Sequence, residues 1–253
     1  MSSFSMSVRV GTIDGRIVAM KRAEGEDARA RLRREARMLA VARLPGVVEV
    51  VALHDHEDEQ AAFTELHTAY VSPVTLASHP PMPPPQVAAL VAALAETVAD
   101  LHQLGMVHGA IRPDHVLISA DGWPVLCSFG SARLLSEDNS PYGATTEEEP
   151  PTGEKRTPAD DVAAIGSLLD ELLGTNADAE PIPDRRFSRT TSRGPYQRKV
   201  LRTIADRASA TDPARRPTAR SLAASIQAAV PNAQPGQPEA PFSRRSRIHA
   251  PRA

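Results

Sequence analysis

The sequence predicts an α+β protein whose strands lie mostly near the N-terminus and whose helices dominate the remainder. Residues 6–21 alternate apolar and polar side chains around Asp14-Gly15, which is the pattern of a β-hairpin. Residues 86–104 carry an apolar stripe at helical spacing, and residues 161–173 repeat this pattern. A chain of 253 residues is long enough to bury a substantial core, as one domain or as a domain of two lobes.

After the hairpin, the N-terminal part is predicted to contain a helix and a strand. Residues 26–44 are rich in Ala, Arg, Leu and Glu and are expected to be helical, with Arg and Glu mostly outside. Pro45 and Gly46 end this helix, and residues 47–53 form a short apolar strand. Residues 54–56, His-Asp-His, are expected in a hydrated loop and not in a metal site, because no further ligands follow at convincing spacing.

The remainder is predicted to be helical with one interruption. The run HPPMPPP at 79–85 is a stiff linker before the helix of residues 86–104, which ends at Gly105. Residues 108–130 predict a loop, a strand, a turn at Asp121-Gly122, a second strand and a loop. Further helices are predicted at 161–173, at 197–210, and from Pro217 or Thr218 to about Val230.

Composition excludes several classes of protein. The net charge of -2 gives no general nucleic-acid signature. Cys127 is the single cysteine, so an internal disulfide is excluded and a reducing compartment fits. No segment approaches the ~20 apolar residues needed to span a bilayer, and the start carries no signal-peptide pattern. We therefore expect a cytoplasmic location and no transmembrane segment.

The stretch HGAIRPDHVLISADGWPVLCSFG, residues 108–130, resembles the catalytic and metal-binding loops of the bacterial eukaryotic-like Ser/Thr protein kinase family. The family pattern is H-R-D-L-K-P-x-N, followed by D-F-G. Gly109 and Arg112 stand where its Arg and Lys belong, and the frame is retained at His108, Pro113, Phe129 and Gly130. The positions of the catalytic Asp, the metal-binding Asn and the Asp of D-F-G are occupied by Ala110, His115 and Ser128.

The same resemblance extends to the N-terminal part. Val-Ala-Met-Lys ending at Lys21 is similar to the family strand V-A-I-K, whose Lys holds nucleotide phosphates and pairs with a helix Glu, here Glu35. Residues 63–71 resemble the strand that leads into the hinge between the lobes. Leu39, with His108 and Phe129, matches the stacked hydrophobic spine across the lobes.

Two motifs in the C-terminal part also resemble the family. Asp161 begins a match to D-V-x-x-x-G-x-x-L-x-E-L, which implies that its carboxylate braces the catalytic-loop backbone. Arg216 lies in a match to D-P-x-x-R-P-[ST], where it would pair with the Glu of an A-P-E motif. No clear A-P-E is present, and residues 149–151, Glu-Pro-Pro, are at best a remnant.

The resemblance runs from about Met6 to Val230 and implies a protein-kinase-like fold of two lobes. A truncated β-rich N-lobe is expected at 1–71, with the family's first strand and Gly-rich lid missing. A mainly helical C-lobe is expected at 72–230. Residues 231–253, rich in Pro and Arg, are expected to form a disordered tail.

The departures imply a pseudokinase that works as a regulatory binding or scaffolding module. Ala110 cannot orient a hydroxyl, and His115 and Ser128 are poor ligands for Mg²⁺, so we expect no intact catalytic residue and no metal site. Any ATP held by Lys21 and Glu35 is expected to bind weakly or without Mg²⁺. The implied partner is a protein, such as an active kinase or a signalling protein.

Two alternatives remain open. Asp114, four residues beyond Ala110, allows a weakly active or atypical ATP-dependent Ser/Thr protein kinase, although a plain loop carboxylate is the favoured interpretation. The other alternative is an adaptor controlled by phosphorylation of Ser and Thr within residues 131–157 or 188–192.

Overall fold

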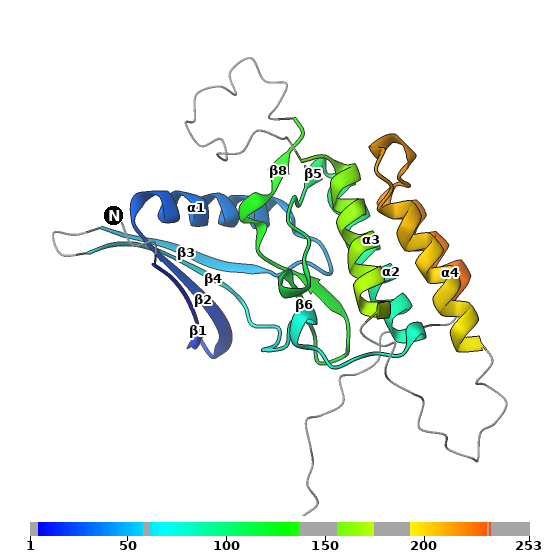
Figure 1. Ribbon diagram of the computed structural model, residues 1–253. Coiled ribbons are helices and arrows are strands. Elements are labelled where there is room, and N and C mark those ends of the chain that lie inside the picture. Colours follow the sequence, from blue (N-terminus) through cyan, green and yellow to red (C-terminus); the bar gives the residue numbers. More distant parts are fainter. Residues whose placement is uncertain (1–4, 58–60, 137–155, 175–192, 232, 234–253) are drawn as a thin grey trace, which may run out of the picture.

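The computed structural model describes residues 5–57, 61–136, 156–174, 193–231 and 233. A sheet with one helix forms the N-lobe, and a group of helices forms the larger C-lobe (Figure 1). This arrangement confirms the predicted α+β class and the two-lobed architecture.

The N-lobe is built on a four-stranded antiparallel sheet in the order β1-β2-β4-β3. Asp14 and Gly15 join the first two strands with φ values of 48° and 77°, as a two-residue hairpin turn requires. The predicted hairpin is therefore confirmed. The elements of this lobe are β1 (Ser5–Ile13), β2 (Arg16–Glu24), α1 (Glu26–Val41), β3 (Val50–Glu57) and β4 (Ala62–Ala69).

Helix α1 is shorter and less solvated than its composition predicts. It ends at Val41 and not at Leu44, because Ala42 caps it with a ψ of 48° and donates its N–H to the Met38 carbonyl. Arg29 and Glu35 are buried, contrary to the expectation that the charged side chains mostly face outward. Glu35 forms an ion pair with Lys21 of β2, and Arg29 forms one with Glu57 of β3. Helical periodicity does not reveal such partners.

Residues 54–56 lie inside strand β3 and not in a loop, which corrects the sequence prediction. Asp55 accepts hydrogen bonds from Thr64 of β4 and from Arg33 of α1, so polar contacts extend the strand beyond its apolar segment. His54 packs at 4.8 Å from His67, and His56 packs at 4.7 Å from Phe63, measured between ring centroids.

The C-lobe helices are α2 (Pro84–Gln103), α3 (Pro158–Gly174), α4 (Arg193–Ala208) and α5 (Ala219–Ala229). Helix α2 packs against α3 and α5, and α3 packs against α4. Pro84 lies at the first position of α2, where its missing N–H is harmless, so the linker ends at Pro83 and not at Pro85. Thr218 caps α5 as predicted, by accepting the N–H of Ser221.

Between α2 and α3 the chain forms short strands and single helical turns. The predicted strand-turn-strand is present as β6 (Val116–Ile118) and β7 (Pro124–Leu126). The short strands β5 (Met106–Val107) and β8 (Arg133–Leu134) pair beside it. The single turns are η1 (Leu76–Ser78), η2 (Pro113–His115), η3 (Phe129–Ser131) and η5 (Pro213–Arg215).

One apolar core runs through both lobes. Leu32 and Leu39 of α1 join Phe129 of η3, Leu101 of α2 and Ile165 of α3 in a single cluster of buried side chains. Because the core crosses between the lobes, it fixes the loops of residues 108–130 relative to β2 and α1. These loops and the two N-lobe elements form the site.

Three expectations concern residues that the structure does not describe. The A-P-E remnant at residues 149–151 lies outside the described residues, as do most of the proposed phosphorylation positions and nearly all of the 231–253 tail. Within the described ranges, no helix has the length and apolar character needed to cross a membrane.

Candidate active site

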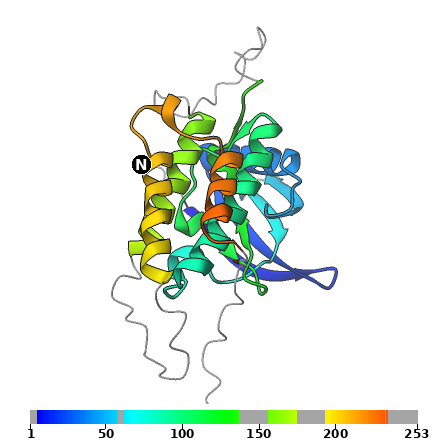
Figure 2. The same ribbon diagram turned by 90° about the vertical axis from the view of Figure 1, so that its right-hand side faces the viewer.

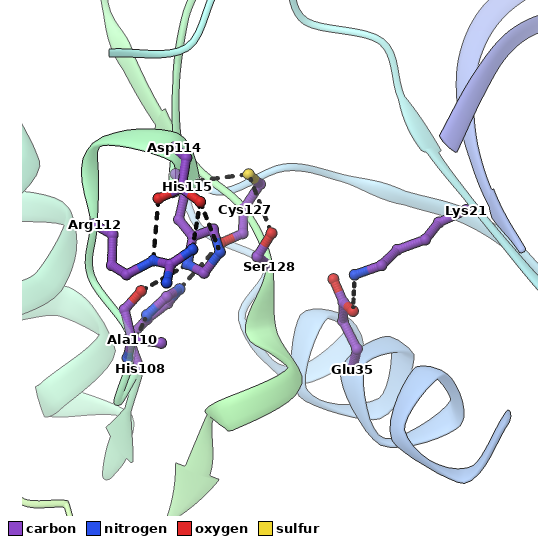
Figure 3. Close-up of polar contacts among 9 residues, drawn as sticks. All are labelled: Lys21, Glu35, His108, Ala110, Arg112, Asp114, His115, Cys127 and Ser128. Atoms are coloured by element: carbon purple, nitrogen blue, oxygen red, sulfur yellow. Dashed lines mark hydrogen bonds and ion pairs between the residues drawn. The ribbon is translucent and has the colours of Figure 1, made fainter. Parts of the chain in front are cut away.

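Lys21 and Glu35 form an ion pair between the sheet and helix α1. The alternation of β2 places Lys21 and the buried Ala23 on the face that α1 covers. Lys21 Nζ lies 2.6 Å from Glu35 Oε2, and the side chains of Lys21 and Glu35 are 22% and 7% exposed (Figure 3). This is the pair that the sequence resemblance implies. Lys21 retains some exposure and can still meet a phosphate oxygen.

His108 is fixed by packing and by hydrogen bonds on both ring nitrogens. Its Nε2–H donates to the Cys127 carbonyl at 3.1 Å, and its Nδ1 accepts the N–H of Ala110 at 3.2 Å. The ring meets Phe129 edge-on, at 4.7 Å between centroids. Burial lowers the pKa of His108, and a neutral ring is the form that these two contacts require. His108 therefore organises the loop and has no free nitrogen for chemistry.

Asp161 of α3 holds the catalytic loop through its carboxylate. Oδ2 accepts the backbone N–H of His108 at 2.9 Å, and Oδ1 accepts that of Gly109 at 2.8 Å. His102 Nε2 lies 3.1 Å from Oδ2 and adds a contact that sequence reasoning missed. The only local signal for it is a His in the last turn of α2.

Gly109 has a structural reason to stand where the family has Arg. Its φ is +75°, and a Cβ at this position would lie 2.8 Å from the backbone carbonyl oxygen of Ser131. A side chain would be strained and would also collide with the neighbouring backbone. The loop is thus built around a glycine, and an Arg cannot be restored there without moving the chain.

The catalytic-Asp position carries only the methyl group of Ala110. His115 turns its ring back toward this residue, and its Nδ1–H donates to the Ala110 carbonyl at 2.7 Å. Its other nitrogen, Nε2, is 3.8 Å from Asp114 Oδ2. His115 therefore uses one nitrogen to hold the loop and offers a single imidazole nitrogen at the position of the metal-binding Asn.

Asp114 is the carboxylate that lies nearest to Ala110 in the sequence on this loop, and Arg112 pairs with it. Arg112 Nε donates to Asp114 Oδ1 at 3.1 Å, and Nη2 contacts Oδ2 (Figure 3). The hydrogen bond from Arg112 lowers the pKa of the Asp114 carboxyl. A carboxylate with a lowered pKa is a weaker proton acceptor than a free one.

Ser128 occupies the D-F-G aspartate position in an unusual backbone conformation. Its φ and ψ are 65° and 59°, in the left-handed region that costs a non-glycine residue about 1–3 kcal/mol. Its hydroxyl lies 3.7 Å from Cys127 Sγ, and that thiol donates to the His115 carbonyl. Burial raises the pKa of Cys127, so the thiol stays protonated and serves packing.

These residues fit a nucleotide phosphate in part and do not fit Mg²⁺. Lys21 can supply a positive charge to phosphate oxygens. The two metal positions hold an imidazole and a hydroxyl, whereas Mg²⁺ prefers carboxylate and carbonyl oxygen. Within the described ranges there is no group of three or more His, Cys, Asp or Glu side chains placed to hold a metal ion.

The remaining predicted positions serve the scaffold. Leu39 and Phe129 lie in the common core. Gly130 follows Phe129 within η3, and a Cβ added at Gly130 would lie 3.8 Å from Glu35 Oε2. Arg216 donates to Asp160 Oδ1 at 3.0 Å, and also to the Ala159 and Ala210 carbonyls. Its described partner is therefore Asp160, and the Glu of the predicted A-P-E remnant lies outside the described residues.

Fold and site together define a protein kinase domain. The family model described as "Protein kinase domain" matches residues 4–225, and the chain belongs to this family. It is similar to the probable serine/threonine-protein kinase PknB of Lactococcus lactis subsp. lactis, with 27% identity over 170 residues, which cover 62% of this chain and 27% of the relative.

Two further relatives show the same pattern. Serine/threonine-protein kinase PknB of Mycobacterium leprae is 27% identical over 155 residues, which cover 56% of this chain and 25% of the relative. Serine/threonine-protein kinase pkn2 of Myxococcus xanthus is 34% identical over 114 residues, which cover 43% of this chain and 13% of the relative. The chain thus matches about a quarter or less of the length of these relatives.

Proposed function

We propose that this protein kinase domain is a pseudokinase, catalytically inactive, which acts as a regulatory binding or scaffolding module. The observation that carries the proposal is the methyl group of Ala110 where phosphoryl transfer needs a carboxylate, inside a loop that Asp161 still braces. Around this position the Lys21–Glu35 pair and the buried His108 are retained. The residues that shape the site are therefore kept, while the catalytic carboxylate is replaced by a methyl group.

The chemical argument concerns what phosphoryl transfer demands. The reaction needs a group that orients the attacking hydroxyl and a divalent cation that neutralises developing charge. The methyl group of Ala110 can neither orient a hydroxyl nor bind a cation. The loss of general-base assistance alone costs roughly 10² to 10⁴ in rate. His115 and Ser128 stand in place of the Asn and Asp whose oxygen atoms would bind Mg²⁺. These losses act on separate requirements, so they compound.

A binding role accounts for what is kept. The proposed units are an N-lobe at 1–71, a C-lobe at 72–230 and a tail at 231–253. A shared core and a braced loop keep both lobes in a defined shape, which a docking protein can recognise. The proposed partner is an active kinase or another signalling protein, met in the cytoplasm. ATP, if bound, would bind weakly and without Mg²⁺.

The second candidate is a weakly active or atypical ATP-dependent Ser/Thr protein kinase. It is favoured by Asp114, which lies four residues beyond Ala110, and by relatives that are named serine/threonine-protein kinases. The ion pair with Arg112 counts against Asp114 as a base, because a rearrangement must first free the carboxylate.

Nucleotide binding with and without divalent metal separates the two candidates. The melting temperature of the purified protein is measured with ATP or ADP, with Mg²⁺, Mn²⁺ or chelator. The pseudokinase proposal expects a shift that is small or absent and that does not depend on metal, and any shift should vanish in Lys21→Met. The exposed Lys199 provides the matched control, Lys199→Met, which should behave like the wild type. A shift that requires metal would favour the atypical kinase.

A further inference from the structure

An apolar groove lies on the C-lobe between α2, α5 and the turn that joins β6 to β7. Helices α2 and α5 pack side by side, and Figure 2 turns the orange α5 toward the viewer. The groove has a volume of about 250 Å³, and alanines of α2 line it together with Ile226 of α5. Trp123 of the turn also lines it and is 53% exposed. None of the lining residues belongs to the candidate active site.

The chain that leaves α5 runs into this groove. Ala233 lines the groove, packs against the apolar core and donates its N–H to the Val230 carbonyl at 3.3 Å. Residues 234–253 follow Ala233 directly and lie outside the described residues. The first residues of this segment are therefore tethered at the groove without a spacer. A tether of this kind gives a segment a high effective concentration at its binding site.

The sequence after Ala233 carries a proline at every third position. These prolines are Pro235, Pro238 and Pro241, in the run Gln-Pro-Gly-Gln-Pro-Glu-Ala-Pro. A polyproline II helix has three residues per turn, so in this conformation the three prolines share one face. Segments of the form P-x-x-P bind in this conformation to grooves lined by aromatic side chains. Pro235 comes two residues after Ala233, a rise of roughly 6 Å, which keeps it at the groove that Ala233 and Trp123 line.

We propose that residues 234–241 bind in this groove as a polyproline II helix, with the proline face against Trp123 and the alanines of α2. The groove is then an internal receptor for a P-x-x-P-x-x-P segment of the same chain. For residues 234–241, this bound conformation replaces the expectation of a disordered tail. The inference does not depend on whether the domain transfers phosphate, because it rests on α2, α5 and Trp123 and not on the catalytic loop.

Charge favours this segment over a second copy of the groove as the occupant. Glu96 is the charged side chain among the described residues that line the groove, and it accepts a hydrogen bond from Gln227 at 2.6 Å. Residues 234–253 carry four Arg against one Glu, so the segment is attracted to this carboxylate. Two copies that met groove to groove would instead bring two Glu96 carboxylates together, which like-charge repulsion opposes.

Fluorescence of the full chain measures this binding, because Trp123 is the single tryptophan. Replacing Pro235, Pro238 and Pro241 by Ala should expose the indole ring, so we expect its acrylamide quenching constant to rise about twofold. Gln234→Ala with Gln237→Ala changes the same segment but keeps the proline face, and this matched control should behave like the wild type. Equal quenching of the wild type and the triple proline variant overturns the proposal, including when the groove serves a different protein.

The spacing of the prolines has its own test. Gln237→Pro with Pro238→Ala keeps three prolines but breaks their three-residue spacing, so its quenching should match that of the triple variant. Quenching like the wild type would show that spacing is irrelevant and would overturn the proposed helix. Circular dichroism and melting curves establish that each variant is folded.

Cross-linking locates the segment directly. In a Cys127→Ala background, a short bismaleimide should join Gln237→Cys to Ala93→Cys, which lines the groove, at least about tenfold faster than to Leu104→Cys. Leu104 is the matched control, because it is 46% exposed and follows the other end of α2. Equal rates at the two positions contradict the proposal. Cross-links that join two chains would assign the groove to a second copy and would overturn it as well.

Discussion

The Asp161 carboxylate accepts the backbone N–H of Gly109 at 2.8 Å across 52 residues of sequence. The same carboxylate holds the N–H of His108, so two consecutive amides of the loop are fixed by one side chain on α3. The next residue is Ala110, at the position of the family's catalytic Asp. Asp161 thus holds in place a loop that carries a methyl group at the position of the family's catalytic Asp, and the proposed pseudokinase assignment rests on this substitution.

Asp161→Asn should destabilise the fold by about 2–3 kcal/mol. The substituted amide turns one acceptor into a donor, so a buried N–H of the loop or the new NH₂ group loses its partner. Urea unfolding measures the change. Asp170→Asn alters an exposed residue of the same helix and should stay within about 0.5 kcal/mol of the wild type. Equal effects at the two positions would mean that the brace does not stabilise the loop.

Removal of one member of the Lys21–Glu35 pair should cost more than removal of both. Lys21→Met leaves the buried Glu35 carboxylate without its cation, which we expect to cost about 3 kcal/mol, the lower end for such pairs because Lys21 keeps some exposure. The double variant Lys21→Met with Glu35→Leu should recover most of this loss. A double-mutant cycle in urea measures the coupling. A coupling near zero would show that the pair is not held in solution.

The pH dependence of stability should carry the signature of His108. Burial keeps the folded-state pKa of this ring below its ordinary value of 6.5, so the unfolded chain binds the proton more readily. Stability from this group is therefore complete above about pH 6.5 and falls as the pH drops from there toward the folded pKa, with a slope of up to about 1.4 kcal/mol per pH unit.

His108→Phe is the test variant, because it keeps the aromatic contact with Phe129 and removes the titration. Its free energy of unfolding should be lower than that of the wild type. It should also change less between pH 7 and pH 5. The carboxyls with lowered pKa, among them Asp55 and Asp114, change their contribution only at lower pH. The difference in slope between the two proteins separates His108 from the other histidines of the chain. Identical slopes in the two proteins would contradict the assignment.

Restoring the two metal positions should restore metal-dependent nucleotide binding before it restores catalysis. Ser128→Asp combined with His115→Asn returns oxygen ligands, and Asp tolerates the left-handed conformation that Ser128 already adopts. We expect a melting shift with ATP that requires Mg²⁺. Ser128→Asn with His115→Asn has nearly the same shape and lacks the new charge, so it should show a much smaller shift. A metal-dependent shift in the wild type would remove the basis of this prediction.

The sequence predicted the elements whose signals are local. Asp14-Gly15 between alternating strands specified the hairpin, and the apolar stripe of residues 86–104 specified α2. The resemblance to the kinase family also implied that Lys21 pairs with Glu35, as the structure has it. What the sequence did not reveal depends on distant partners. Arg29 of α1 is buried with its charge paired to Glu57 of strand β3, which is 28 residues away in the sequence. The left-handed Gly109 makes sense only once the Ser131 carbonyl is seen beside it.

The same distinction applies to the end of α1 and the start of β3. Leu44 looked helical from composition, whereas the backbone of Ala42 turns out of the helix and leads the chain to an isolated bridge between Val47 and Leu126 of β7. The predicted strand at 47–53 was displaced toward Glu57 for a similar reason, since Thr64 and Arg33 hold Asp55 in the ladder. Tertiary contacts decided these boundaries, and local propensity could not.

Phosphotransfer from labelled ATP tests the central claim most directly. The full chain is incubated with Mg²⁺ or Mn²⁺ and with a general protein substrate, and autophosphorylation is followed in parallel with Lys21→Met. The pseudokinase account predicts incorporation that is no greater in the wild type than in Lys21→Met. Incorporation by the wild type that Lys21→Met abolishes would contradict it and would establish the alternative of an atypical kinase.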